Sequence, residues 1–370
     1  MTLRQAQGER GWEDKILKPG STIGILGGGQ LGRMLAIAAA QLGYRTLIYS
    51  PEEHSVAADV SADWYADDWH DAAALAEFAG RCDVVTWEWE NVPTGPLAAI
   101  AGKLAAPLRA LEVAQDRLAE KRFVEELGGR PAPYAAVDSP ADLPDALRAV
   151  GAPAILKTRR DGYDGKGQWR IDTPADAAAL DLPDRPLICE GRVAFEAEFS
   201  VILARGSDGG LRFWDSAHNR HEDGMLATST LPPPAIVLAQ VEEARALARR
   251  LAEALDYVGV LTCEFFATAD GPVFNEMAPR VHNSGHWTIE GALTSQFAGH
   301  IRAICGLPLG DASTIADRIA MRNIVGAEAL APYACLAEPD THLHLYGKRE
   351  ALEGRKMGHV TRLWRTSDAR

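Results

Sequence analysis

The chain has few cysteines and no long apolar run, and both absences narrow the kinds of protein that it can be. Its five cysteines are scattered over 370 residues, with no CxxC pair and no histidine at zinc-ligand spacing. We therefore expect reduced, mostly buried thiols in a cytoplasmic protein rather than a disulfide scaffold or a zinc site. Even the alanine-rich stretch 35–42 is far shorter than the roughly 18 apolar residues of a membrane span, so we expect no membrane partner.

Basic residues are also in the minority. The chain has 38 Lys and Arg against 51 Asp and Glu, which gives a formal net charge of -13. Its average field would repel a phosphate backbone, so we expect no nucleic-acid partner, and anionic small substrates must be met by local basic pockets. No Ser, Gln or Pro tract and no internal repeat interrupts the sequence, so we expect about two or three folded domains.

The order of predicted elements divides the chain into a leader and three folded parts. Residues 1–20 carry several charges and lack the apolar stretch of a signal peptide, so they are interpreted as a solvated leader. A strand, a glycine turn, a helix and a second strand then predict a parallel βαβ unit, and we expect this α/β domain to span 21–128. Short strands separated by Gly, Asp and Pro predict an α+β domain over 129–310, and a small domain over 311–370 follows.

Periodicity locates the longer elements within these parts. Apolar spacing predicts helices over 111–127, 236–255 and near 288–305. The predicted strands lie at 22–26, 45–49, 83–86, 154–157, 168–171, 187–190, 198–203, 259–266 and 272–275.

The first glycine turn has a familiar pattern. Gly27, Gly29 and Gly32 fit GxGxxG between a strand and a helix, and Glu52 and Glu53 follow about where a ribose-binding acid would lie. An NAD-dependent dehydrogenase is therefore one hypothesis. The turn by itself does not specify a dinucleotide, because glycines let the backbone approach a ligand and a helix N-terminus favours any phosphate.

A second glycine-rich loop lies between two predicted strands and opens no helix, so it is not a P-loop. Its residues are Gly162, Tyr163, Asp164, Gly165, Lys166, Gly167 and Gln168. Such a loop would expose backbone N–H groups to phosphate oxygens while Lys166 adds charge; an ordinary hairpin loop is the alternative. Lys157 on the preceding strand and Arg117 on an earlier helix favour the phosphate interpretation.

Two carboxylates fall on neighbouring predicted strands. Glu264 and Glu276, with the Asn275 amide, offer the hard oxygen ligands that suit Mg²⁺ carrying a nucleotide. Buried unpaired carboxylates are costly, which favours a metal over a chance pair. Arg280, His282 and Asn283 follow in one donor-rich loop, and because no Ser–His–Asp order or GxSxG elbow is present, we interpret this loop as an oxyanion site.

A last basic cluster lies near the end of the chain. It contains Lys348, Arg355 and Lys356 within two glycine-flanked motifs. A solvated basic face and a substrate-binding cluster both fit this pattern on local grounds.

Together these motifs resemble the ATP-grasp superfamily, and within it the 5-(carboxyamino)imidazole ribonucleotide synthases. The matching segments are 27–34, 162–168, 275–276, 278–287 and 354–359. The resemblance implies an ATP-grasp fold with a lid at about 131–200, an N-terminal Rossmann-like (pre-ATP-grasp) domain, a small C-terminal domain and usually a homodimer. It also disfavours the dinucleotide hypothesis, since in this superfamily the N-terminal domain holds the substrate rather than NAD.

The resemblance implies an ATP-dependent carbon–nitrogen ligase of purine synthesis. With Mg²⁺ and bicarbonate, such an enzyme carboxylates the amine of 5-aminoimidazole ribonucleotide through carboxyphosphate, and attack on carboxyphosphate or on CO₂ released from it both stay open. The alternatives within the superfamily are a formate-dependent glycinamide ribonucleotide transformylase and a biotin-type carboxylase, and the donor run 280–286 argues against both. A non-enzymatic nucleotide sensor would have no need of Glu264, Glu276 and the whole glycine loop.

Residue roles follow from the same resemblance. The nucleotide contacts are expected at Arg117, Lys157, Gly162, Tyr163, Asp164, Gly165, Lys166, Gly167, Gln168, Glu190, Gly191, Arg192, Val193, Glu198, His221, Asn275 and Glu276. Glu264 and Glu276 would bind Mg²⁺, Arg280, His282 and Asn283 would meet bicarbonate and carboxyphosphate, and Glu198 would meet the ribose of ATP. The ribonucleotide pocket is expected to contain Gln30, Leu31, Glu88, Tyr163, Asp164, Lys348 and Arg355, with Asp164 as the candidate base.

Overall fold

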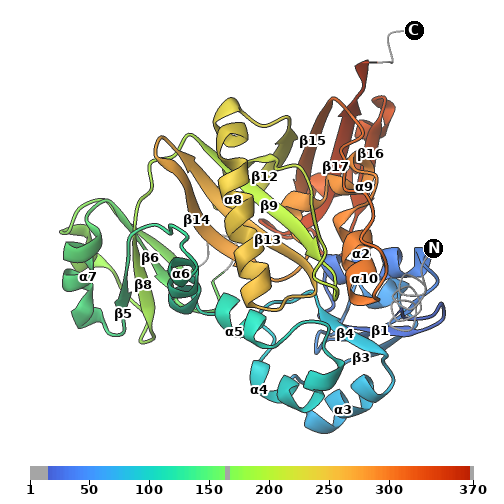
Figure 1. Ribbon diagram of the computed structural model, residues 1–370. Coiled ribbons are helices and arrows are strands. Elements are labelled where there is room, and N and C mark those ends of the chain that lie inside the picture. Colours follow the sequence, from blue (N-terminus) through green and yellow to red (C-terminus); the bar gives the residue numbers. More distant parts are fainter. Residues whose placement is uncertain (1–15, 163–166, 367–370) are drawn as a thin grey trace, which may run out of the picture.

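The structure, a computed structural model, describes residues 16–162 and 167–366, which form three β-sheets with helices packed around them (Figure 1). Over these residues, we find no helix that is both long enough and apolar enough to cross a membrane. Each sheet is built mainly from one of the successive parts of the chain.

The N-terminal part is a four-stranded parallel sheet in the order β3-β2-β1-β4. Its strands are β1 (Thr22–Leu26), β2 (Arg45–Tyr49), β3 (Asp63–Tyr65) and β4 (Val84–Trp87). Helix α2 (Gln30–Gln41) starts directly after the glycine turn and ends before Gly43, whose φ of 80° is easy only for glycine. The predicted strand–turn–helix–strand unit is therefore confirmed. The smaller elements here are η1 (Ala58–Val60), α3 (Ala72–Gly80), α4 (Thr94–Leu97) and η2 (Ala98–Lys103).

The prediction of one continuous helix over 111–127 is wrong. The structure has two helices, α5 (Arg109–Ala114) and α6 (Arg117–Glu126). The break lies at Asp116, whose carboxylate accepts hydrogen bonds from the N–H groups of Leu118 and Ala119 and so caps α6. Apolar periodicity continues through the break and hides it, whereas the cap places Arg117 in the first turn of α6.

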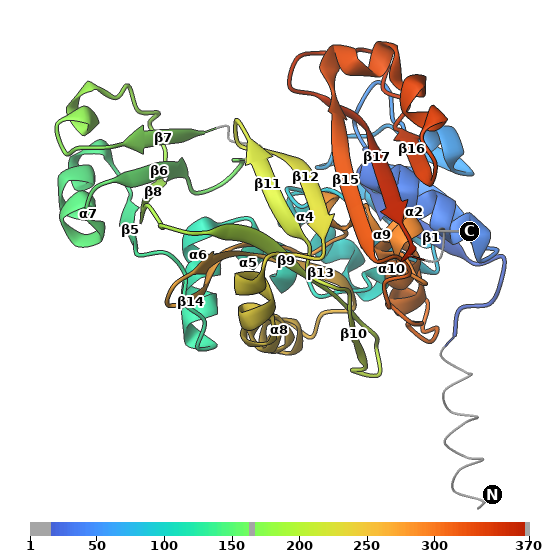
Figure 2. The same ribbon diagram turned by 90° about the horizontal axis from the view of Figure 1, so that it is seen from above.

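A four-stranded antiparallel sheet stands at one end of the molecule (Figure 2). Its order is β5-β8-β6-β7, and its elements are β5 (Tyr134–Val137), η3 (Pro140–Asp142), α7 (Leu143–Val150), β6 (Ala154–Thr158), β7 (Gln168–Ile171), η4 (Asp176–Ala179) and β8 (Leu187–Gly191). Helix α7 covers this sheet and shares a separate small apolar core with it, which includes Val137, Leu147 and Leu156. This small sheet carries the second glycine-rich loop between β6 and β7.

A nine-stranded antiparallel sheet forms the centre, in the order β14-β13-β9-β11-β12-β15-β17-β16, with β10 paired to β9. Its strands are β9 (Ala197–Arg205), β10 (Leu211–Phe213), β11 (His218–Glu222), β12 (Met225–Leu231), β13 (Gly259–Thr268), β14 (Gly271–Ala278), β15 (Arg318–Val325), β16 (Thr341–Leu345) and β17 (Lys356–Trp364). Because β15 pairs with β12, the last part of the chain extends the central sheet. The boundaries drawn at 128 and 310 stay predictions.

Helices α8 (Ala235–Ala254) and α10 (Gln296–Ile304) pack on β9 and β13 (Figure 1). The single helix predicted near 288–305 is wrong: a short helix α9 (Thr288–Gly291) is followed by a turn, and α10 begins again after Ser295, whose side chain caps it by accepting from the N–H of Ala298. The remaining short elements are η5 (Asn283–Gly285), η6 (Gly326–Leu330) and η7 (Pro332–Ala337).

Candidate active site

A cleft of about 680 Å³ is lined by residues of the small and central sheets, by segments that follow strands of the N-terminal sheet, and by the loop between β16 and β17. The predicted site residues in its lining are Gln30, Leu31, Glu88, Arg117, Lys157, Gly162, Gln168, Glu198, His221, Glu264, Asn275, Glu276, Arg280, His282, Asn283, Lys348 and Arg355. Segments far apart in the sequence thus meet at one place. Of the other predicted residues, Gly167, Glu190, Gly191, Arg192 and Val193 are described but lie outside the lining, and Tyr163, Asp164, Gly165 and Lys166 lie outside the described residues.

Glu264 and Glu276 lie opposite each other on β13 and β14. Burial, together with the charge of Glu276, raises the pKa of Glu264 to about 7. Burial acts in the same direction on Glu276, but Arg117, whose Nη1 lies 3.0 Å from Glu276 Oε2, and Lys157 outweigh it and hold the pKa of Glu276 below its usual value. Two carboxylates thus face each other at the cleft, Glu264 buried and Glu276 partly exposed, and a cation between them would relieve their repulsion.

The donor set fits a magnesium ion that also binds phosphate. Among the described residues, no group of three or more His, Cys, Asp or Glu side chains is arranged to hold a metal. Mg²⁺ commonly binds through one or two carboxylates and takes its other ligands from substrate phosphates and water. The facing pair Glu264 and Glu276 matches that pattern, and both amide atoms of nearby Asn283 are buried without a hydrogen-bond partner.

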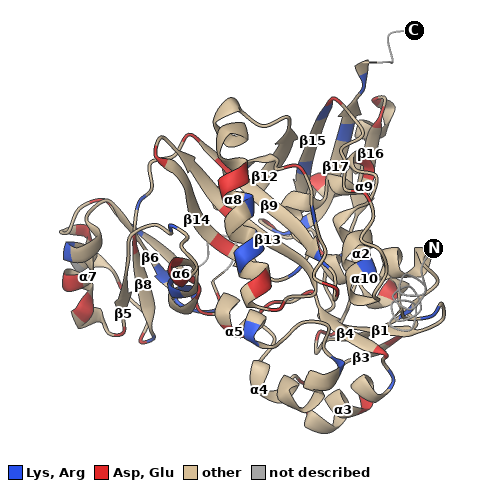
Figure 3. Cartoon of the chain, in the orientation of Figure 1, with Lys and Arg blue, Asp and Glu red and all other residues tan. Residues whose placement is uncertain are grey.

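Lys157 belongs to a buried ion-pair network. Its Nζ lies 2.9 Å from Glu190 Oε2, and Lys121 Nζ lies 3.4 Å from the same oxygen. Burial raises the pKa of Glu190, but the two lysines outweigh it and bring that pKa to about 2. Burial lowers the pKa of Lys157, and Glu190 opposes this change. Figure 3 shows basic and acidic segments close together where β6 lies beside α6. The side chain of Glu190, predicted to contact nucleotide, thus points to Lys157.

Sequence reasoning missed two charged residues of α6. Glu120 accepts a hydrogen bond from the N–H of Met277 at 2.6 Å, and Lys121 Nζ lies 3.4 Å from the carbonyl oxygen of Asn275. Together they bind α6 to both sides of Glu276. Burial raises the pKa of Glu120 to about 8, although Lys121 opposes this. Charged residues in a helix are usually solvated; the available signal was their spacing of three and four residues from Arg117, which puts all three on one face.

Glu198 on β9 and His221 on β11 form an ion pair in the cleft wall. Burial would lower the pKa of His221, but the hydrogen bond to Glu198 and the charge of Glu264 outweigh it, so this pKa is raised. His221 therefore carries positive charge more readily than an ordinary histidine. Strand β9 pairs with β13, which carries Glu264, and β11 pairs with the other side of β9.

The donor loop after β14 contains a positive and a neutral group side by side. Arg280 donates to the carbonyl oxygen of Val281 at 3.0 Å, and its Nη2 lies 2.8 Å from Glu90 Oε2, a residue that sequence reasoning did not select. Burial and the charge of Arg280 lower the pKa of His282 well below its usual value, so its imidazole is neutral at pH 7. With Asn283, these groups can meet an anion through one cation and two uncharged polar side chains.

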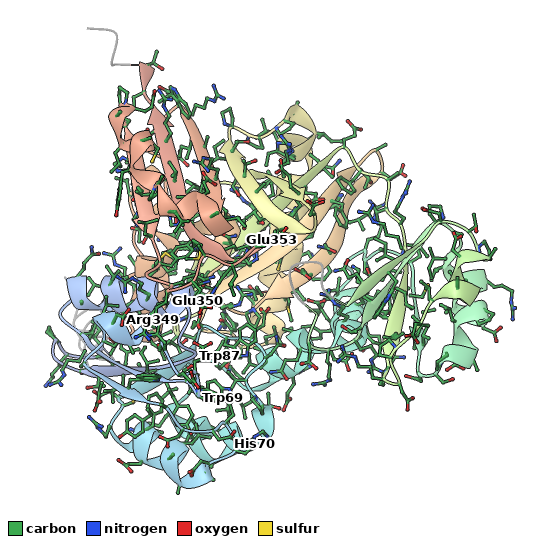
Figure 4. The ribbon with its side chains drawn as sticks, turned by 180° about the vertical axis from the view of Figure 1, so that it is seen from behind. Trp69, His70, Trp87, Arg349, Glu350 and Glu353 are labelled. Atoms are coloured by element: carbon green, nitrogen blue, oxygen red, sulfur yellow. The ribbon has the colours of Figure 1, made fainter. Side chains whose placement is uncertain are left out.

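The loop between β16 and β17 brings Lys348 and Arg355 to the cleft. Figure 4 shows Arg349 and Glu350 on this loop where it passes the N-terminal sheet, and Glu353 farther along toward the central sheet. Burial and the neighbouring charge of Arg355 lower the pKa of Lys348 to about 8. The interpretation of this cluster as a solvated face is therefore disfavoured. Further residues of this pocket that sequence reasoning did not assign to it are Ser50, His54, Trp69 and Lys356.

Three protein-family models match successive parts of the chain. The ribonucleotide synthetase preATP-grasp domain matches residues 20–115, the ATP-grasp domain matches 122–297, and the phosphoribosylaminoimidazole carboxylase C-terminal domain matches 319–370. The predicted fold, an ATP-grasp domain with a pre-ATP-grasp domain before it and a small domain after it, is confirmed.

Curated relatives match over nearly their full length. The N5-carboxyaminoimidazole ribonucleotide synthase of Brucella melitensis is 50% identical over 354 residues, which cover 94% of this chain and 97% of that protein. The enzyme of the same name from Pseudomonas aeruginosa is 44% identical over 346 residues, covering 92% and 93%.

Solved structures of N5-carboxyaminoimidazole ribonucleotide synthases are also similar to this chain. The N5-carboxyaminoimidazole ribonucleotide synthetase from Thermus thermophilus is 46% identical with a TM-score of 0.86, covering 92% of this chain and 93% of that one. An Aspergillus clavatus N5-carboxyaminoimidazole synthase, in complex with ADP and 5-aminoimidazole ribonucleotide, is 32% identical with a TM-score of 0.84, covering 93% and 94%. The chain therefore belongs to the N5-carboxyaminoimidazole ribonucleotide synthase family of ATP-grasp enzymes.

Proposed function

We infer that this chain is an ATP-dependent carbon–nitrogen ligase of purine biosynthesis, which carboxylates the amine of 5-aminoimidazole ribonucleotide. One observation carries the inference: a single cleft joins facing carboxylates, buried lysine and arginine side chains, a donor loop and a second basic cluster. The Aspergillus clavatus relative in complex with ADP and 5-aminoimidazole ribonucleotide supports the same two ligands for this chain.

Bicarbonate is the carboxyl donor in this proposal. Its carbon is a poor electrophile because the ion is negatively charged and hydroxide is a poor leaving group. Transfer of the γ-phosphoryl group from ATP to a bicarbonate oxygen gives ADP and carboxyphosphate, which has phosphate as its leaving group. The exocyclic amine then forms a bond to the carboxyl carbon, directly or after CO₂ has been released, and phosphate and a proton leave.

The described residues divide this work between two ends of the cleft. At the nucleotide end, Arg117 and Lys157 supply positive charge to the phosphates. A Mg²⁺ ion held by Glu264 and Glu276 would supply further charge neutralisation there. At the other end, Arg280 pairs with the anionic intermediate, while neutral His282 and Asn283 offer hydrogen bonds without adding charge.

The ribonucleotide end is built from the N-terminal sheet and the β16–β17 loop. Lys348 and Arg355 supply cations for the phosphate of the substrate, which a chain of net charge -13 would otherwise repel. Gln30, Leu31 and Glu88 line the same cleft. Asp164 stays the proposed base for the amine proton.

Two further parts of the proposal rest on membership of the family: a cytoplasmic location and a homodimer. Sedimentation velocity on the purified chain tests the second of these. A species of about 40 kDa at micromolar concentration, close to the 39.9 kDa of one chain, would contradict it.

One assay separates the proposed reaction from its relatives. Phosphate release from ATP is followed while bicarbonate and 5-aminoimidazole ribonucleotide are added singly and together. We expect rapid release only when both are present, with consumption of the ribonucleotide. Release that depends on formate and glycinamide ribonucleotide, or on biotin, would assign the chain to another ATP-grasp activity.

A further inference from the structure

The side-chain amide of Gln296 forms two hydrogen bonds with the backbone of His282. Its Oε1 accepts a hydrogen bond from the N–H of His282 at 2.9 Å, and its Nε2 donates to the carbonyl oxygen of the same residue at 2.6 Å. Gln296 is fully buried, with 0% of its surface exposed. One amide group thus satisfies both backbone groups of His282, as a neighbouring strand would.

The position of Gln296 is itself fixed by hydrogen bonds and by packing. Gln296 is the first residue of α10, and its backbone N–H donates to Thr288 Oγ1 at 2.9 Å, while that hydroxyl donates to the carbonyl oxygen of Gly285 at 2.6 Å. A Cβ atom at Gly285 would lie 2.5 Å from Gln296 Oε1, so the loop and the amide are in close contact. Helix α10 packs on β9, β13 and α2, and this packing anchors Gln296 in the core.

His282 lies between two other residues that line the cleft. Arg280 precedes it, and Asn283 follows it with both amide atoms buried and unpartnered. The loop has little regular structure of its own, because η5 is only three residues long. Within the loop, the carbonyl oxygen of His282 also accepts from the Gly285 N–H at 3.0 Å, and His282 Nδ1 lies 2.9 Å from Ser284 Oγ. From outside the loop, Gln296 adds two hydrogen bonds to His282 alone.

We propose that Gln296 is a positioning residue, which holds His282 and Asn283 in the geometry that retains carboxyphosphate until the amine has reacted. This inference rests on the proposed function. If the loop moves, carboxyphosphate meets water: its P–O bond to the carboxyl group breaks, bicarbonate and phosphate form, and the ATP has been spent without carboxylation. Gln296 thus acts on how tightly ATP use is coupled to product formation.

The test compares phosphate release with consumption of 5-aminoimidazole ribonucleotide in Gln296→Met, which removes both hydrogen bonds at similar side-chain length. We expect kcat for ribonucleotide consumption to fall about tenfold or more, since two hydrogen bonds at the loop are lost. The KM values for ATP and for the ribonucleotide should stay within about twofold, because Lys157, Arg117, Lys348 and Arg355 are untouched. Phosphate released per ribonucleotide consumed should rise from about one to several.

Ser295→Ala is the matched control, since it removes the cap of the same helix without touching the loop. It should lower the melting temperature but keep the ratio near one. Gln296→Glu keeps the acceptor for the His282 N–H and loses the donor, so its ratio should be intermediate, and it decides the question if Gln296→Met does not fold. A wild-type ratio and kcat in a folded Gln296 variant, or an equal rise in Ser295→Ala, would overturn the proposal. Wild-type protein that consumes no ribonucleotide would instead contradict the proposed function.

Discussion

Glu88 Oε1 accepts a hydrogen bond from the backbone N–H of Gly29 at 2.7 Å. This contact puts a carboxylate at the N-terminus of α2, where a dinucleotide-binding domain holds the pyrophosphate. A Cβ atom at Gly27 would lie 2.6 Å from the same oxygen, so the glycines make room for Glu88. Burial raises the pKa of Glu88, and the Gly29 N–H opposes this change. The GxGxxG pattern here thus supports a carboxylate contact.

We therefore predict that the chain does not bind NAD. The carboxylate of Glu88 occupies the phosphate position and would repel a pyrophosphate. Trp69 and Trp89 line the cleft, so tryptophan fluorescence reports on ligands there. Titration with ADP should give saturable quenching as the positive control. Saturable quenching by micromolar NAD would restore the dehydrogenase hypothesis.

Glu276→Gln should reduce kcat by at least about a hundredfold while the protein stays folded. The change keeps the shape of the side chain but removes one of two charges proposed for Mg²⁺, which is worth several kcal/mol in the transition state. Steady-state rates over a range of Mg²⁺ concentrations provide the measurement. Glu243→Gln, an exposed change on α8, is the control. Normal turnover of Glu276→Gln at saturating Mg²⁺ would remove this residue from the metal site.

Arg355→Ala should raise the KM for 5-aminoimidazole ribonucleotide about ten- to a hundredfold, because a charge-assisted contact of roughly 1.5–3 kcal/mol is lost. The KM for ATP should barely move, since the nucleotide end of the cleft is untouched. Arg349→Ala is the matched control: it removes the same charge from an exposed position on the same loop (Figure 4). Equal changes in both KM values would indicate a folding defect. No change in either KM would mean that Arg355 is a solvated surface charge.

The pKa of about 8 at Lys348 predicts a pH effect on the ribonucleotide alone. Below this pKa the lysine is charged and attracts the substrate phosphate; as pH rises through it, the charge is lost. We expect kcat/KM for the ribonucleotide to fall above about pH 8, while kcat/KM for ATP shows no such step. Lys348→Arg should flatten the profile because arginine stays charged. An unchanged profile in this variant would mean that another group titrates.

Glu190→Gln should destabilise the fold by roughly 3–5 kcal/mol, because it leaves Lys157 and Lys121 buried without their shared carboxylate. It should also raise the KM for ATP, since Lys157 loses the partner that orients it. Urea denaturation and steady-state kinetics measure the two effects. Glu126→Gln, an exposed change on α6, should be nearly neutral. A stable Glu190→Gln protein with normal ATP kinetics would contradict the network.

The sequence alone was sufficient for much of this protein because its strongest signals are local. The first strand, its glycine turn and helix α2 follow from apolar spacing and from glycines at the ends of elements, and the structure has them in the predicted order. That Glu264 and Glu276 lie on adjacent strands was also accessible, since two strands joined by a short turn form a hairpin. Counting from the turn would put Glu264 opposite Asn275; only the structure shows the register shift between Glu264 and Phe265 that makes Glu276 its partner. The donor loop after β14 follows at once, so its place beside that pair was implied.

The tertiary structure alone decided the contacts between segments that are distant in sequence. Gln296 meets His282, Glu190 joins Lys157 to Lys121, and Glu88 reaches Gly29. Each contact places a buried polar group against one specific partner, and the local sequence does not say which residue that partner is. Apolar spacing records which face of an element is buried but not which neighbour it meets. That choice depends on how the sheets and α6 and α10 pack together, because a buried polar group is stable only where the packed fold supplies its partner.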